Sequence, residues 1–349
     1  MQTRASIVAI AARTPVGLCA EASAAAIRAG ISRIDEHPFM VDADGDPLGC
    51  GRDPDVDPTL FGADRCIELL VSALAELHAK AAAFAPERVA LVVELAVAEP
   101  RPGFEAGSER RLAAEVARRA PMGPRAFEVR VAGRGHAGVF VALDNAVKSI
   151  ARGEREVCIV AGVDSYLHAD TLDWLDADRR IARASTRGGF PPGEAAAALL
   201  VVSERVRRDL RLPSPAAVVA VACAHEPRDE TAPEGLQGEG LQRAIGEAAA
   251  GRDRSSPRID RLYCDINDER ARSTDLGFAL LRCGDLFRDG TDYVTPVGNV
   301  GDVGAATGAL NCILAASAWS RGYASGTNAL ISGASWGGLR GAALLERND

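Results

Sequence analysis

The stretch HAGVFVALDNAVKSIARGEREVCIVAGVDS, residues 136–165, decides the fold. It predicts a helix over 137–152 that begins with small residues and closes at Gly153, followed by a β-branched strand over 157–161. A second stretch repeats this pattern: GAATGALNCILAASAWSRG (304–322) closes at Gly322, and NALISGASWGG (328–338) follows it. The repetition indicates an internal duplication, with two halves packed about a pseudo-two-fold axis.

The rest of the chain alternates short apolar runs with longer Ala-rich segments, which is typical of an α/β protein with buried strands. The strands are predicted at 6–11, 89–93, 157–161, 197–202, 217–222, 261–264, 329–332 and 342–346, and the helices near 21–29, 62–84, 108–119, 137–152, 239–250, 274–286 and 305–321. Helices with Ala and Gly on nearly every face must be buried on nearly every face, so we expect a five-layer α-β-α-β-α stack. The turn LRLPSP (210–215) predicts a boundary between an N-terminal half, 1–210, and a C-terminal half, 211–349.

Composition excludes several functions. The 349 residues carry a net charge of -8 without a basic block, which argues against nucleic acid or an anionic membrane as a partner. The only lysines are Lys80 and Lys148, and neither lies in a Gly-rich phosphate loop, so Walker-type NTPase chemistry is excluded. The longest strongly apolar run, 195–202, is far too short to span a bilayer.

The eight cysteines are scattered, without a C-x-x-C pair or the spacing of metal ligands. Cys158 and Cys312 lie inside apolar runs, where a free thiol acts as a small hydrophobic side chain. This usage favours a reducing compartment, so we expect a cytoplasmic protein. No motif in the sequence indicates a cofactor or a metal ion.

Five segments, taken in order, resemble the β-ketoacyl synthases, the condensing enzymes of the thiolase superfamily. They are IVAIAARTPVG (7–17), AIRAGISRI (26–34), NAVKSIARGEREVCIVAGVDS (145–165), GGFPPGEAAAALLV (188–201) and SWGGLRGAALL (335–345). The resemblance implies a thiolase-like fold over nearly the whole chain. It also implies where the catalytic residues of the family would stand.

Condensing enzymes of this family use a cysteine nucleophile and two histidines, and the resemblance places His136, Asp265 and Asp302 in those three positions. For the third position a shift of one residue, or a register that places Asn299 there, stays open. The residues of the family that contact a pantetheine chain and gate the tunnel correspond to Asn267 and Trp336. Because His136 and Trp336 are bulkier than Cys and Phe, we expect a narrowed or filled acyl tunnel.

These replacements disfavour decarboxylative condensation. An acyl-imidazole hydrolyses readily and is a poor store for an acyl group. Ionised carboxylates cannot donate hydrogen bonds to an enolate oxygen, as the two histidines of the family do. The resemblance therefore leads to a catalytically degenerate β-ketoacyl-synthase-like protein that serves as a binding, adaptor or chaperone subunit, for example in the export of type VI secretion effectors.

Two other functions stay open for the same residues. One is an acyl-thioester hydrolase or acyltransferase that uses His136 with Asp265 or Asp302. The other is a metal site formed by one histidine and two carboxylates. These ligand types suit iron or manganese, although the spacing of the residues in the sequence does not indicate a metal site. As partners we expect a second copy or a thiolase-like paralogue, with an effector or an acyl carrier protein as further candidates. The segment AFEVRVAGRGHAG (126–138) has the alternating pattern of an edge strand that such a dimer would cover.

Overall fold

A computed structural model describes residues 4–81, 91–122, 127–183, 188–228, 232, 235–251 and 256–348. Ten strands form one sheet in the order β10-β9-β11-β12-β8-β1-β7-β6-β4-β5. Their bounds are β1 (Ala5–Arg13), β4 (Leu91–Val97), β5 (Phe127–Arg134), β6 (Val157–Ser165), β7 (Glu194–Ser203), β8 (Ala216–His225), β9 (Arg261–Tyr263), β10 (Tyr293–Val294), β11 (Asn328–Ala334) and β12 (Leu339–Arg347). A separate hairpin pairs β2 (Ile34–Val41) with β3 (Pro47–Gly51).

The internal duplication is visible in the sheet. The strand order β5-β4-β6-β7-β1 in the first half matches the order β10-β9-β11-β12-β8 in the second, position by position. The directions match as well: β4 is parallel to β5 and β6 as β9 is to β10 and β11, and the remaining pairs within each half are antiparallel. The halves join where Ala5–Ile7 of β1 pairs with residues 216–218 of β8.

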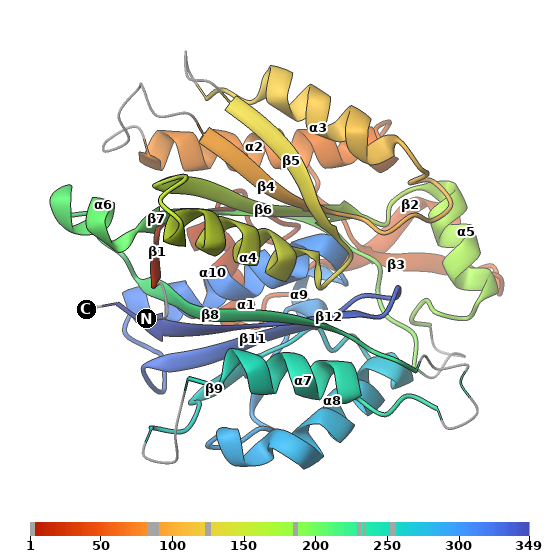
Figure 1. The fold of residues 1–349 in the computed structure, drawn as a ribbon. Coiled ribbons are helices and arrows are strands. Elements are labelled where there is room, and N and C mark those ends of the chain that lie inside the picture. The colour runs from red at the N-terminus through yellow and green to blue at the C-terminus, as the bar shows by residue number, and fades with distance from the viewer. Residues whose placement is uncertain are drawn as a thin grey trace.

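The helices complete a five-layer stack, as expected from the sequence (Figure 1). The outer layer over the first half holds α2 (Gly62–Ala81) and α3 (Ser108–Arg119), and that over the second half holds α7 (Glu239–Ala248) and α8 (Arg270–Cys283). Between the two halves of the sheet lie α1 (Ala20–Arg28), α4 (Gly138–Ala151) and α10 (Thr307–Ser320). The shorter helices are α5 (Ala169–Ala177), α6 (Glu204–Asp209) and α9 (Val297–Val300), with 3-10 turns at Gly284–Leu286 and Gly304–Ala306.

The middle layer depends on small residues. In α10 every residue from Thr307 to Trp319 is buried, because the helix packs against β6 and β7 on one side and β11 on the other. In α4 the Phe140 ring is fully buried and fills the space above Gly333 and Gly341. A Cβ on Gly341 would lie 2.3 Å from that ring, so glycine is required there.

The sequence analysis found most of these elements and missed several short ones. Its helix over 108–119 agrees with α3, whereas the helix expected over 274–286 begins earlier, at Arg270. The start of the strand expected at 89–93 and the end of the helix expected at 62–84 lie outside the described residues. The hairpin β2-β3 and the helices α5, α6 and α9 were not predicted, and the turn over 210–215 lies between α6 and β8.

The helices in the described parts of the chain include none with both the length and the apolar run that crossing a bilayer requires.

Candidate functional site

His136 lies at the entry to α4, in the middle layer. Gly135 directly before it has φ +67°, and a Cβ at that position would lie 2.4 Å from Glu99 Oε2, so the turn requires glycine. The Ala137 amide donates to Ser335 Oγ at 3.0 Å, which fixes the start of the helix. The His136 side chain is 2% exposed.

Asp302 meets His136 in this interior. His136 Nε2 lies 2.7 Å from Asp302 Oδ1, and the same oxygen accepts from the Gly304 amide at 2.8 Å. The Asp302 amide donates to the Pro191 carbonyl, which ties the loop to the segment before β7. Burial raises the pKa of Asp302, but His136, Arg272 and the Gly304 amide lower it more, so the carboxyl lies well below its usual range.

Asp265 does not contact His136, because a buried arginine lies between them. Arg272, in the first turn of α8, donates from Nη1 to Asp265 Oδ2 and to the Ala334 carbonyl. Its Nη2 lies 3.0 Å from His136 Nδ1 and 3.2 Å from Nε2. Burial lowers the pKa of Arg272, but the three carboxylates nearby, chiefly Asp265, raise it above its ordinary value. The structure therefore joins His136, Asp265 and Asp302 through a cation that the sequence analysis did not identify.

Arg272 lies against the face of the imidazole ring. Its Nη2 is almost equally far from Nδ1 and Nε2, at 3.0 and 3.2 Å, so the guanidinium does not lie along the lone pair of one nitrogen. Nε2 is the ring nitrogen that contacts the Asp302 carboxylate. His136 is therefore enclosed between a guanidinium and a carboxylate.

A second layer of polar contacts holds this network in place. Asn267 Nδ2 donates to Asp302 Oδ2 at 2.5 Å and to Glu269 Oε2 at 3.1 Å. Glu269 also pairs with Arg272, and with Arg180 at 2.5 Å. The Arg180 guanidinium stacks over the Trp336 ring, 4.3 Å from its centroid. Asn267 is therefore built into the network, and Trp336 lies at its outer side.

Little free space reaches His136. The cavity bordered by His136, Asp265, Asn267 and Asp302 has a volume of about 10 Å³, enough for at most one water molecule. A larger cavity of about 140 Å³ lies farther out and is lined by Trp336, Arg180 and Arg272 among others. The expected filling of the inner tunnel agrees with this geometry. Asn299 donates to the Ile31 carbonyl instead, so Asp302 is the residue that contacts His136.

The N-terminal domain of β-ketoacyl synthases matches residues 113–206, which include α4, β6 and β7. The fold of the rest agrees with this match, since solved ketosynthases superpose on the whole chain. This chain has the thiolase-like fold of the ketosynthases. Comparison with curated proteins gives no significant match.

Three solved structures show the extent of the likeness. The ishigamide ketosynthase/chain length factor is 17% identical, with a TM-score of 0.80 and full coverage of both chains. A type II polyketide-synthase acyl-carrier protein in complex with its ketosynthase, bound to the hexaketide, gives 13% identity and a TM-score of 0.80, again over both full chains. The ketosynthase from module 6 of the bacillaene synthase of Bacillus subtilis 168 gives 12% and 0.77, covering 99% of this chain and 72% of that one.

No thiol of the ketosynthase-like chain lies in the network around His136. All eight cysteines are free, and six of them are buried. Burial raises the pKa of Cys158 and Cys283 to about 11, and that of Cys50, Cys223 and Cys312 to about 12. Cys264, next to Asp265, is likewise buried, and burial raises its pKa strongly. A thiolate nucleophile requires the opposite shift.

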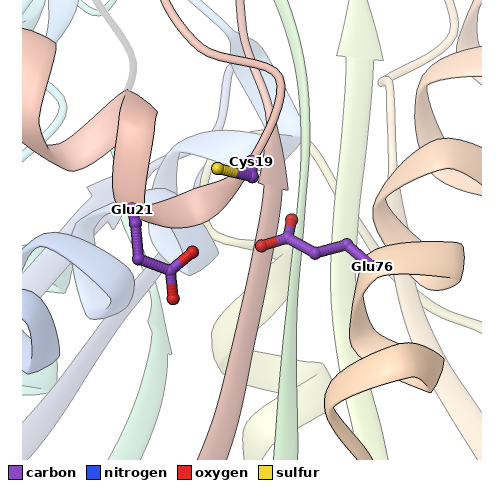
Figure 2. Close-up of side chains that lie close together, drawn as sticks. All are labelled: Cys19, Glu21 and Glu76. Carbon is purple, nitrogen blue, oxygen red and sulfur yellow. The ribbon is translucent and has the colours of Figure 1, made fainter.

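Among the described residues, one group has three potential metal ligands close together: Cys19, Glu21 and Glu76, within 4.8 Å of one another (Figure 2). The ammonium group of Lys80 already lies where a metal ion would bind in this group. Lys80 Nζ donates to Glu21 at 2.8 and 2.9 Å, to Glu76 at 2.6 Å and to the Ile10 carbonyl at 2.8 Å. The group therefore anchors α2 to β1 and α1, and a metal ion would have to displace the ammonium.

The sequence analysis missed Arg272 because it placed the helix start after this residue. The helix begins at Arg270, with Glu269 as its N-cap, and a Glu–Arg pair three residues apart faces one side of a helix. Arg272 is 5% exposed, so its side chain belongs to the buried network and not to the surface of the helix.

Proposed function

We propose that this ketosynthase-like protein is a non-catalytic subunit that acts by binding, as an adaptor or chaperone. The observation that carries the proposal is the enclosure of the His136 ring. Arg272 Nη2 lies 3.0 Å from Nδ1 and 3.2 Å from Nε2, and Asp302 contacts Nε2. A general base needs a lone pair directed at its substrate, and a nucleophile needs room for attack, whereas the space beside this ring is about 10 Å³.

The carboxylates support the same proposal. Condensation needs hydrogen-bond donors at the thioester oxygen, where negative charge develops. Asp302, with its lowered pKa, stays ionised at neutral pH and only accepts, and Asp265 Oδ2 already accepts from Arg272 and the Ala334 amide. Both positions thus offer negative charge at a place where the reaction requires a donor.

The alternative is an acyl-thioester hydrolase or acyltransferase built on His136. One observation favours it: the His136 Nε2 to Asp302 Oδ1 contact of 2.7 Å has the form of a histidine oriented by a carboxylate. In such an enzyme the other nitrogen, Nδ1, would have to reach the substrate. Arg272 lies on that nitrogen, so the alternative requires Arg272 to leave.

Mass spectrometry tests the two functions directly. The protein is incubated with an acyl-CoA, or with an acylated carrier protein, and its intact mass is followed together with the release of free thiol. The non-catalytic subunit is expected to show no adduct and no turnover. A covalent adduct that disappears in His136→Ala would overturn the proposal and establish the alternative.

As partner we propose a second copy, or a related subunit, bound along β5. This strand ends the sheet, and its outer edge has no neighbour among the described strands. Phe127, Val129 and Val131 pack toward the first-half core, whereas Glu128 and Arg130 point to solvent. An antiparallel pair of β5 strands centred on Val129 places Glu128 of one copy opposite Arg130 of the other. Opposite charges facing each other across such a pair are favourable.

Charge inversion tests this contact. Arg130→Glu places like charges opposite each other, so we expect the dimer to dissociate at least tenfold more readily, which corresponds to about 1.4 kcal/mol. The double variant Glu128→Arg, Arg130→Glu restores opposite charges and is expected to dimerise like the wild type. Light scattering coupled to gel filtration measures both. A wild-type chain that stays monomeric by itself contradicts the homodimer and favours pairing with a related subunit.

For the cargo of this subunit we propose a type VI secretion effector, with an acyl carrier protein as the second candidate. The first rests on the sequence resemblance alone. The second draws on the solved complex of a carrier protein with its ketosynthase, which has the same fold over the full chain.

A further inference from the structure

A pocket of about 140 Å³ lies at the end of α10 that is remote from the His136 network. Thr307, at the start of the helix, lines the small cavity beside His136, whereas Ala318 and Trp319, near its other end, line this pocket. An α-helix rises about 1.5 Å per residue, so Thr307 and Trp319 lie about 18 Å apart along the axis. The pocket is therefore separate from the His136 network.

The walls of this pocket are mainly apolar. They include Ala318, Trp319 and Ala324 in and just after α10, together with Tyr263 of β9 and Val294 of β10. A cavity of similar volume with apolar walls is known to hold benzene. The pocket accordingly accommodates one six-membered ring or a branched group of that size.

Two tyrosine hydroxyls on the wall form no hydrogen bond with a described residue, namely those of Tyr263 and Tyr323. Tyr263 is only 7% exposed, but its Oη retains accessible surface, so a molecule in the pocket can reach it. Burial raises the pKa of Tyr263 to about 12, so the hydroxyl keeps its proton and can donate it. A donor without a partner in a nearly buried position indicates a ligand that accepts from it.

The charged groups of the lining are already paired. Asp260 accepts from Arg288 at 2.8 Å and from two backbone amides at 2.8 and 3.2 Å. Arg261 donates to Asp292. Neither lining charge therefore has to be neutralised by a ligand, and the two tyrosine hydroxyls remain available.

The charged side chains that act on the two hydroxyls are arginines. The Arg28 guanidinium lies over the Tyr323 ring, 3.8 Å from its centroid. Burial raises the pKa of Tyr323, and Arg28 and Arg321 lower it, as Arg261 does for Tyr263. Such surroundings favour a ligand with negative charge.

We propose that this pocket binds a small monocarboxylic acid with a compact apolar body, of about the size of benzoate. Its carboxylate accepts from the Tyr263 and Tyr323 hydroxyls, and its apolar body lies against Trp319 and Val294. Hydrogen bonds to an ionised acceptor are stronger than those between neutral groups. An organic ammonium fits less well, because the Arg28 guanidinium already covers the Tyr323 ring.

Saturation-transfer NMR with sodium benzoate, on the full chain at pH 7.5, tests the proposal. We expect saturable binding that is weakened at least about tenfold in Tyr263→Phe, because a hydrogen bond to a charged group is lost while the ring stays in place. Tyr293→Phe is the matched control. Tyr293 is 42% exposed and does not line the pocket, so this variant is expected to bind benzoate like the wild type.

Two further compounds separate the contribution of the ring from that of the charge. Toluene has the ring without the carboxylate, so it is expected to bind the wild type and Tyr263→Phe equally. Benzylamine carries the opposite charge and is expected to bind more weakly than benzoate. Thermal unfolding without ligand shows whether Tyr263→Phe is folded. No saturable benzoate signal, equal benzoate binding by Tyr263→Phe, or tighter binding of benzylamine than of benzoate would overturn the proposal.

Discussion

Replacing Arg272 with methionine is expected to lower the free energy of unfolding by about 3–5 kcal/mol, as breaking a buried ion pair does in other proteins. The guanidinium compensates Asp265 and Glu269 and lies against His136, and it is 5% exposed. Without the guanidinium, the Asp265 and Glu269 carboxylates stay buried, and no other cation takes its place between them. Chemical denaturation followed by circular dichroism measures the change.

Arg118 provides the matched control for Arg272. It lies on the exposed face of α3 and pairs with Glu115 three residues away, in a solvent-screened contact. Arg118→Met is expected to leave the denaturation midpoint unchanged. If Arg272→Met also leaves it unchanged, the network around His136 is not a stability element, and the assignment of a structural role to Arg272 is wrong.

Replacing Phe140 with alanine is expected to cost about 3–5 kcal/mol by a different mechanism, the opening of a cavity in a packed core. The ring is fully buried in α4 and lies against the backbone of Gly333 and Gly341. Neither glycine has a side chain that could move into the space. The middle layer therefore cannot relax around the missing ring.

The comparison residue for Phe140 is Phe39 on β2, whose side chain is 76% exposed. Phe39→Ala is expected to unfold at the same denaturant concentration as the wild type. A loss of stability in Phe140→Ala no larger than that in Phe39→Ala would show that the middle layer repacks freely.

The fold was predictable because the same pattern of helix and strand occurs in both halves of the sequence. Two similar helix and strand segments, each closed by a glycine, indicated the duplication, and both halves have the same strand order. The elements that were missed are short or polar. In the hairpin strand β2, buried and exposed residues alternate little and most are exposed, and α6 has no buried residue. Neither segment therefore has apolar residues at the regular spacing that predicts a strand or a helix.

The site was predictable only in part. Resemblance placed His136 and Asp302 at positions that the structure brings to 2.7 Å, although they are far apart in the sequence. The arrangement of these residues depends on Arg272, which the resemblance did not single out. Its role follows from a helix that begins four residues earlier than expected, which turns its side chain inward. Local propensity is least informative at helix ends, and here a helix end sets the charge of the site.

The burial of α10 on every side also bears on how this chain acquires its structure. A helix without a polar face has no stable place in water, so α10 is stable only when both halves of the sheet are present to cover it. The helix belongs to the second half of the sequence, yet it packs against β6 and β7 of the first. Folding of the two halves is therefore mutually dependent, and a ribosome must release most of the chain before the central layer can close.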